Sequence, residues 1–93
     1  QITLPPVVPV QDQIPLRGRN VLIIGGSTGC GRFVAERFYA EGANVIITSR
    51  FPECYERPYK ILKLDIRYEC QVKKLIKKVA KIFNGKIDIL INC

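Results

Sequence analysis

Short runs of mostly apolar residues alternate along this chain with longer segments in which apolar residues recur every three or four positions. The runs cover residues 20–25, 44–49, 60–64 and 86–91, and they are rich in Val and Ile. A strand that is covered on both faces of a parallel sheet needs no polar side, so runs of this kind indicate buried strands. We therefore predict four strands at these positions.

Two segments between these runs have the spacing of amphipathic helices. In residues 31–41, apolar side chains at positions 34, 35 and 38 share one helical face, and Gly42 follows as the expected stop. The stronger signal lies in residues 72–83, with apolar side chains at positions 72, 75, 76, 79, 80 and 83. Residues 50–59 contain two prolines and lack such spacing, so they predict a loop with a weak helix or none.

Strands that alternate with crossover segments form β-α-β units, whose strands are parallel. The chain is therefore predicted to have an α/β fold: a Rossmann-type parallel sheet with flanking helices, the first half of a doubly wound fold. Residues 1–16 hold four of the six prolines, which remove backbone donors and fix φ. We expect a proline-rich extended arm over 1–16 and a Rossmann half-domain, incomplete as given, over 17–93.

The net charge of +7 comes largely from five lysines of the second predicted helix, at positions 73, 74, 77, 78 and 81. A basic surface can attract nucleic acid or an anionic membrane. These lysines instead have the spacing of the polar face of an amphipathic helix and are not interleaved with aromatic residues. We expect a solvated face and no nucleic-acid partner. No apolar run approaches the roughly 18 residues that a membrane span needs.

Four cysteines, Cys30, Cys54, Cys70 and Cys93, are scattered through the chain without a C-x-x-C pair, and the chain has no histidine. A histidine-containing zinc site is therefore excluded, and we predict no metal site. Scattered cysteines also favour reduced thiols over a disulfide framework. The expected location is intracellular, with the cytoplasm favoured and an organelle left open.

A glycine-rich segment, residues 25–31, stands between the first predicted strand and the first predicted helix. Gly25, Gly29 and Gly31 would permit a sharp turn and the close approach of a pyrophosphate, to which the helix N-terminus offers free N–H groups. Ser27 and Thr28 add hydroxyl donors. Glycine-rich turns can also be plain connections, but the place of this one between strand and helix favours a phosphate cradle.

The spacing G-x-x-x-G-x-G in this segment resembles the short-chain dehydrogenase/reductase family, whose fingerprint is T-G-x-x-x-G-x-G; Ile24 stands where that family usually has threonine. Residues 16–23 are similar to the family's entry into its first strand, and residues 64–66 to the end of its third. Residues 88–93 look like the opening of its D-x-L-x-N-N-A-G motif, with Cys93 in place of the second asparagine. The resemblance covers residues 16–93.

This resemblance implies further contacts with a dinucleotide. Asp65 matches the family's aspartate that hydrogen-bonds the adenine ring, with Ile66 beside it, and Asn92 matches the asparagine that ends the fourth strand. By position alone, Asp65 could equally cap a helix, and Asn92 could be an ordinary residue at a strand end. Cys30 stands where the family usually has an apolar residue, so packing under the loop is favoured over redox chemistry.

The end of the second predicted strand bears on the choice of dinucleotide. An acidic residue there would bind the ribose 2′-hydroxyl of NAD(H) and repel a 2′-phosphate. This strand ends in Thr48, Ser49 and Arg50, and the next acidic residue is Glu53. Because arginine forms forked hydrogen bonds with phosphate and serine adds a donor, we predict NADP(H) rather than NAD(H).

Catalysis in the family implied by the resemblance needs a serine and a Tyr-x-x-x-Lys pair. Tyr59 and Lys63 have this spacing, but they fall at a predicted strand, where residues four apart do not meet. We predict no catalytic residue in this chain. The favoured interpretation is the dinucleotide-binding part of a longer, NADP(H)-dependent enzyme that transfers hydride to or from a carbonyl or alcohol. The alternative is a truncated, non-catalytic relative that acts as a structural or binding subunit.

The predicted strand 86–91 would be left at an edge of the sheet with open hydrogen-bonding groups. We expect that edge to be covered by a protein partner or by further residues of the same chain. A complete protein of this kind is expected to form a homo-oligomer.

Overall fold

The structure is a computed structural model that describes residues 15–93, so most of the predicted arm lies outside the described residues. The first half contains the strand β1 (Asn20–Ile24), the helix α1 (Gly29–Ala40) and the strand β2 (Asn44–Ser49). The second half contains a short 3-10 helix, η2 (Pro52–Cys54), the strand β3 (Lys60–Lys63), the helix α2 (Glu69–Ile82) and the strand β4 (Ile89–Asn92). None of the helices in this part of the chain is long and apolar enough to cross a membrane.

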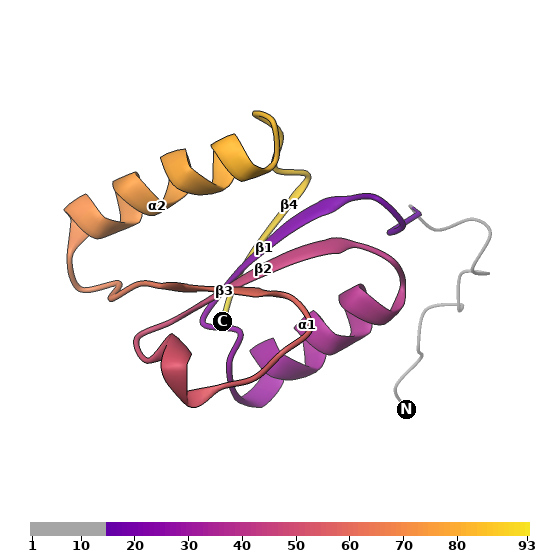
Figure 1. The fold of residues 1–93 in the computed structure, drawn as a ribbon, viewed down its shortest axis with the longest axis horizontal. Coiled ribbons are helices and arrows are strands. Elements are labelled where there is room, and N and C mark those ends of the chain that lie inside the picture. The colour runs from indigo at the N-terminus through magenta and orange to yellow at the C-terminus, as the bar shows by residue number, and fades with distance from the viewer. Residues whose placement is uncertain (1–14) are drawn as a thin grey trace, which may run out of the picture.

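The four strands form one parallel sheet in the order β3-β2-β1-β4 (Figure 1). Leu22 in the centre of β1 lies opposite Ile46 of β2 on one side and Leu90 of β4 on the other. The chain moves outward from β1 to β3 and then returns to the other side of β1. This reversal is the switch point of a doubly wound Rossmann sheet, and it confirms the predicted fold.

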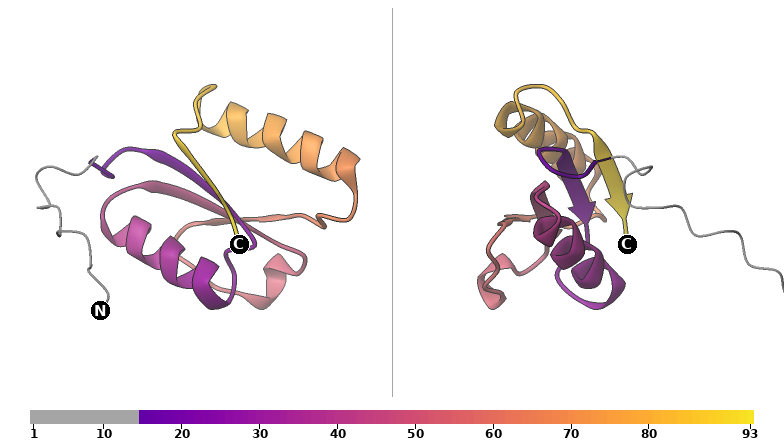
Figure 2. Two further views of the ribbon diagram at one scale, coloured as in Figure 1. Left: turned by 180° about the vertical axis from the view of Figure 1, so that it is seen from behind. Right: turned by 90° about the vertical axis from the view of Figure 1, so that its right-hand side faces the viewer.

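The two helices cover opposite faces of the sheet (Figure 2). Alternate residues of β1 point to opposite faces of the sheet, because successive side chains of a strand point in opposite directions. Val21 and Ile23 pack with Ala35 of α1 in one core, whereas Leu22 packs with Leu75 and Val79 of α2 in the other. A strand that is buried on both faces explains why β1 is a continuous apolar run.

Three predicted strand ranges were too long. The first strand ends at Ile24 rather than at residue 25, and the third ends at Lys63 rather than at residue 64. The fourth begins at Ile89 rather than at residue 86 and ends at Asn92. At the fourth, the Asp88 carboxylate accepts a hydrogen bond from the Asn20 N–H across 2.8 Å, and the Asn20 side chain donates to the Lys86 carbonyl across 2.9 Å. These side-chain hydrogen bonds add to the backbone bond from the Asp88 N–H to the Asn20 carbonyl, 2.9 Å, at this end of β1.

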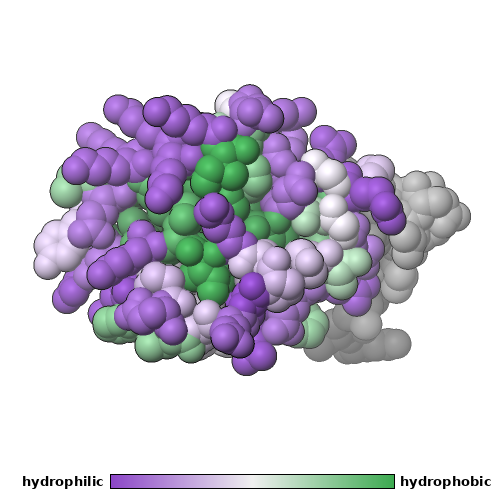
Figure 3. Space-filling view, in the orientation of Figure 1, coloured by the Kyte–Doolittle hydropathy of each residue, from purple (hydrophilic) through white to green (hydrophobic). Residues whose placement is uncertain are grey.

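The loop predicted for residues 50–59 is confirmed apart from the single turn of η2. Among the described residues, β4 pairs only with β1, so its other edge is open. Leu90 on this strand is 56% exposed. Figure 3 views the molecule from the side opposite to β4 and shows an apolar band across its middle, below α2, bordered by hydrophilic side chains.

Candidate dinucleotide-binding site

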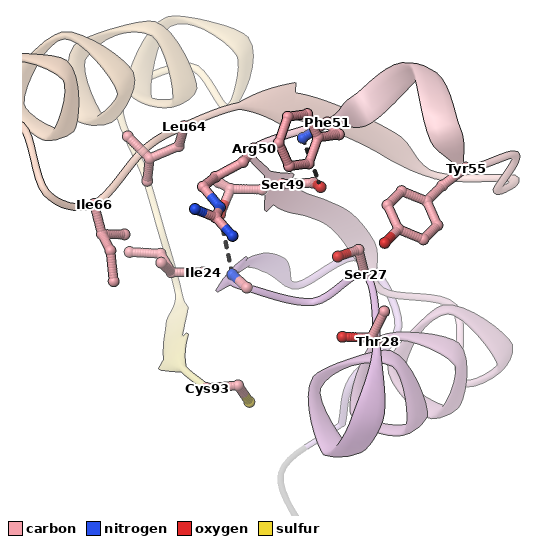
Figure 4. Close-up of a pocket in the computed structure, with 12 residues that line it drawn as sticks. Ile24, Ser27, Thr28, Ser49, Arg50, Phe51, Tyr55, Leu64, Ile66 and Cys93 are labelled. Atoms are coloured by element: carbon pink, nitrogen blue, oxygen red, sulfur yellow. Dashed lines mark hydrogen bonds between the residues drawn. The ribbon is translucent and has the colours of Figure 1, made fainter.

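A pocket of about 300 Å³ opens at the carboxyl ends of β1, β2 and β3, beside the start of α1. In parallel α/β sheets this end of the strands, at the switch point, is where ligands bind. Six predicted site residues line it: Gly25, Ser27, Thr28, Ser49, Arg50 and Ile66. The other residues of its wall are Ile24, Thr48, Phe51, Tyr55, Leu64 and Cys93 (Figure 4).

The turn that carries the three predicted glycines cannot hold a larger residue at any of them without strain or displacement. Gly25 and Gly29 have φ values of +84° and +61°, a region that other residues rarely adopt. At Gly31 a Cβ would lie 2.8 Å from the Gly25 carbonyl oxygen and 3.0 Å from the Gly26 Cα. Gly31 therefore allows the start of α1 to lie directly against the turn.

The N-terminus of α1 is open to an anion. Thr28 is the N-cap residue, but its side chain makes no capping hydrogen bond, and the first turn of the helix contains no acidic residue. The first N–H groups of a helix lack partners within the helix, and the helix dipole places partial positive charge there. Ser27 and Thr28 face the pocket at this point, so the turn offers the hydrogen-bond donors that a pyrophosphate requires.

The glycine turn is tied to β2 by a residue that the sequence did not single out as a site residue. The Thr48 hydroxyl accepts a hydrogen bond from the Gly25 N–H across 3.0 Å, and Thr48 is only 2% exposed. At Ile24, where the resemblance places a threonine, this chain has no hydroxyl. Thr48, from the neighbouring strand, provides one on the same turn.

Arg50 provides positive charge at the pocket (Figure 4). Its guanidinium carbon lies 5.5 Å from the centre of the Phe51 ring, and it forms no ion pair with any residue in 15–93. Ser49 is held in place because its hydroxyl accepts a hydrogen bond from the Phe51 N–H across 3.1 Å. A cation without an acidic partner remains available for an anionic ligand.

Asp65 and Asn92 lie beside the pocket rather than in its wall. The Asp65 carboxylate is bound by the Arg67 guanidinium, with Nη2 2.6 Å from Oδ2 and Nε 3.0 Å from Oδ1. These hydrogen bonds lower the pKa of Asp65 to about 2, so the carboxylate is ionised at neutral pH. Asn92 ends β4 opposite Ile24.

Arg57 was missed by the sequence analysis. Its Nη2 donates to the Ser27 carbonyl across 3.3 Å, and its guanidinium carbon lies 5.3 Å from the centre of the Tyr55 ring. Arg57 thus connects the loop after η2 to the glycine turn, from a position outside the pocket wall. An arginine between two loop residues carries no sequence signal for such a contact, because the contact joins loops 30 residues apart.

Tyr59 and Lys63 do not form a catalytic pair. Tyr59 is 6% exposed and packs in the core beneath α1, with its ring centre 5.6 Å from that of Tyr39. Burial raises the pKa of the Tyr59 hydroxyl, whereas the catalytic role would require a lowered one. Lys63 ends β3 and is exposed.

The chain matches the family of short-chain dehydrogenases over residues 19–93. It is 36% identical to a 3-ketodihydrosphingosine reductase of Yarrowia lipolytica over 78 residues, which are 84% of this chain and 18% of that protein. It is 35% identical to the peroxisomal 2,4-dienoyl-CoA reductase of Rattus norvegicus over 89 residues, or 84% of this chain and 30% of that one.

Solved structures agree with the sequence comparison. The ligand-free aldohexose dehydrogenase of Thermoplasma acidophilum superposes with a TM-score of 0.76 at 37% identity, covering 84% of this chain and 30% of that one. The 3-ketoacyl-(acyl-carrier-protein) reductase of Brucella melitensis, solved in complex with NADH, gives a TM-score of 0.70 at 30% identity, with 81% and 34% covered.

The chain spans roughly a fifth to a third of the length of the relatives named above. Its pocket lies at the switch point of a Rossmann sheet, beside a closely packed glycine turn at the start of α1. On this fold, this site and these matches, the chain belongs to the short-chain dehydrogenase family, a family of nicotinamide-dinucleotide oxidoreductases.

Proposed function

We propose that this chain forms the NADP(H)-binding part of a dehydrogenase or reductase that transfers hydride between the nicotinamide and a carbonyl or alcohol substrate. The observation that carries the dinucleotide preference is Arg50, which lines the pocket at the end of β2 without an acidic partner in the described residues. NAD(H)-binding sites of this fold commonly hold a carboxylate near this position. Ser49 and Arg50 provide a hydroxyl and a forked cation instead.

The residues of the pocket fit the parts of such a ligand. The glycine turn, with Ser27, Thr28 and the open N-terminus of α1, would hold the pyrophosphate. Leu64 and Ile66 offer apolar surface to an adenine ring. Ser49 and Arg50 would bind the 2′-phosphate. When bound, the nicotinamide supplies the hydride chemistry; the serine and the Tyr-x-x-x-Lys pair of the family have no counterpart in this chain.

The test is an equilibrium titration of the purified protein with NADPH and with NADH, followed by dinucleotide fluorescence. We expect NADPH to bind at least about tenfold more tightly, which corresponds to about 1.4 kcal/mol. Arg50→Ala should remove most of this difference and leave the affinity for NADH nearly unchanged. Arg32→Ala is the matched control, because Arg32 is an exposed arginine that pairs with Glu36 across 2.9 Å and does not line the pocket. Equal affinities in the unmodified protein would contradict the NADP(H) assignment.

We also propose that the open edge of β4 is covered in the working protein, either by further residues of the same chain or by a protein partner. Leu90 is 56% exposed on this strand, and an apolar edge strand favours pairing with another strand. A non-catalytic subunit held in an assembly by this edge is the second candidate function. Hydrogen exchange of the β4 amides distinguishes a covered edge, which exchanges slowly, from an open one. An oligomer that dissociates when Leu90→Lys is introduced would place the edge in an interface between copies.

A further inference from the structure

Two cysteines that are far apart in the sequence meet at the glycine turn. Cys30 is the second residue of α1, and Cys93 directly follows β4. The β4 edge brings them together, because its register with β1 places the end of β4 beside the end of β1. In the short-chain dehydrogenase family, neither position is usually a cysteine. The pair is therefore a feature of this sequence rather than a shared element of the fold.

Cys93 is packed tightly against the turn. Its N–H donates to the Ile24 carbonyl across 2.9 Å. Its carbonyl oxygen would lie 2.8 Å from a Cβ at Gly25, and its own Cβ would lie 3.2 Å from one at Gly31. The side chain thus rests on the residue that follows Cys30.

The side chains of the two cysteines are close to one another. The Cys93 sulfur points toward the start of α1 in Figure 4, and the Cys30 thiol is near enough to contribute to a raised pKa of Cys93. Both cysteines are free and exposed, and Cys93 also lines the dinucleotide pocket. A reaction at this pair is therefore a reaction at the mouth of the pocket.

We propose that Cys30 and Cys93 form a reversible disulfide that closes the dinucleotide pocket, so that oxidation of this pair switches off dinucleotide binding. The proposal rests on the dinucleotide-binding function proposed above. The physical reason is lack of space, because a bond between the two sulfurs would tie the end of β4 to the first turn of α1. The glycine turn between them, which has no room for even a methyl group at Gly31, would then lose the freedom to admit a pyrophosphate.

A peroxide is the oxidant by chemical class. The sulfur of Cys30 attacks one peroxide oxygen, the O–O bond breaks, and a sulfenic acid and one water are formed. The sulfur of Cys93 then attacks the Cys30 sulfur, the S–O bond breaks, and the hydroxyl leaves as a second water with the Cys93 thiol proton. Two thiols and one peroxide thus give one disulfide and two waters. Partial desolvation of the Cys93 thiol against the turn, together with the neighbouring Cys30 thiol, raises the pKa of Cys93.

The first arm of the test maps the cross-link. The reduced protein is treated with hydrogen peroxide at low concentration, checked as a monomer on a non-reducing gel, and digested with trypsin. Cleavage at Arg19, Arg32 and Lys86 releases Cys30 in the peptide 20–32 and Cys93 in the peptide that starts at residue 87. We expect these two peptides to be linked in most of the oxidised protein. A link that involves Cys54 or Cys70 to a similar extent would overturn the pairing.

The second arm measures NADPH binding to the reduced, the peroxide-treated and the dithiothreitol-restored protein. We expect at least a tenfold loss of affinity on oxidation and full recovery on reduction. Cys30→Ser and Cys93→Ser, each compared with its own reduced form, should lose no affinity with peroxide. Cys54→Ser and Cys70→Ser, at exposed cysteines outside the pocket wall, should respond as the unmodified protein does.

The outcomes separate this proposal from the one on which it rests. A cross-linked protein that still binds NADPH with full affinity would overturn the switch and leave the proposed function intact. A reduced protein that binds neither NADPH nor NADH would contradict the proposed function, and the switch with it. In that case the peptide map still decides whether the two thiols pair.

Discussion

The Thr48 hydroxyl and the Gly25 N–H are joined by a 3.0 Å hydrogen bond that links the second strand of the sheet to the first residue of the glycine turn. The donor belongs to a residue with a φ of +84°, and the acceptor is 2% exposed. The hydrogen bond is partly buried, so this hydroxyl stabilises a backbone conformation that the turn requires.

Thr48→Val keeps the size of the side chain and removes the acceptor. We expect the free energy of unfolding to fall by about 0.5–1.5 kcal/mol, the size of one ordinary hydrogen bond, because the bond to the Gly25 N–H is lost. Affinity for the dinucleotide should fall with it, since the turn that faces the pyrophosphate loses its anchor. Thr48→Ser is the matched variant: it retains the hydroxyl and should keep most of the affinity. Chemical denaturation and NADPH titration measure the two effects, and equal affinities of the two variants would show that the hydroxyl does not matter.

Arg57 supports the same turn from the loop after η2. Replacing it with alanine removes the hydrogen bond to the Ser27 carbonyl and the contact with the Tyr55 ring. We expect about a fivefold loss of dinucleotide affinity, which corresponds to about 1 kcal/mol, the size of one ordinary hydrogen bond. Arg57→Lys can still donate to the carbonyl but lacks the planar group that lies over the ring. Its dinucleotide affinity should therefore lie between that of the unmodified protein and that of Arg57→Ala. An unchanged affinity in Arg57→Ala would contradict a role in positioning the turn.

Gly31→Ala tests whether close packing of α1 on the turn is essential. The new Cβ would lie 2.8 Å from a backbone oxygen and 3.0 Å from a backbone carbon, atoms that cannot move independently of the turn. We expect a loss of stability of about 1–3 kcal/mol or more from overpacking, and a loss of measurable dinucleotide binding. Gly18→Ala is the control. Gly18 has a φ of +77° but open space around it, so this variant should lose about 1–2 kcal/mol of stability and retain binding. Similar binding by the two variants would contradict the close-packing argument.

Periodicity alone was enough to predict the sheet and both helices, because a strand such as β1, covered on two faces, must be apolar at every position. It misplaced the start of β4, where the Asp88 carboxylate accepts a hydrogen bond from the Asn20 backbone N–H. A sequence pattern records burial, and it does not record which polar side chains bond to the backbone at a strand end. The missed contact of Arg57 with Ser27 is of the same kind, because it joins residues that only the completed fold brings together.

The glycine turn and Arg50 were found because strand, turn and helix follow one another directly in the sequence. The sequence pattern assigned Thr48 only to the end of the second strand. A threonine is common in strands because it packs well there, so its presence does not indicate a second role. Its hydrogen bond to Gly25 depends on the register of β2 against β1. That register is a property of the sheet and is absent from any local pattern.

The pair of Asp65 and Arg67 makes a pH-dependent contribution whose sign follows from the lowered pKa. The pKa of Asp65 is about 2 in the folded protein, below its ordinary 3.8, chiefly because Arg67 donates hydrogen bonds to the carboxylate. The contribution is therefore fully present above about pH 4 and is lost as the pH falls through about 2. Arg67→Gln should bring the Asp65 pKa back toward 3.8 and remove most of this contribution. The free energy of unfolding at neutral pH should then fall slightly, and it should change less as the pH is lowered from about 4 to 2.

The measurement is an NMR titration of the Asp65 carboxyl carbon, with urea denaturation at several pH values between about 2 and 7. The control is Arg37→Gln, which breaks an exposed ion pair of similar kind, Arg37 with Glu41 at 3.2 Å, on the other side of the sheet. Because that pair lies at the C-terminal end of α1 and Asp65 follows β3, its removal should leave the Asp65 titration unchanged. An Asp65 pKa that stays near 2 in Arg67→Gln would mean that other groups hold the carboxylate, Arg50 being the other cation that lowers it. The double variant with Arg50→Ala would then raise the pKa where Arg67→Gln alone did not.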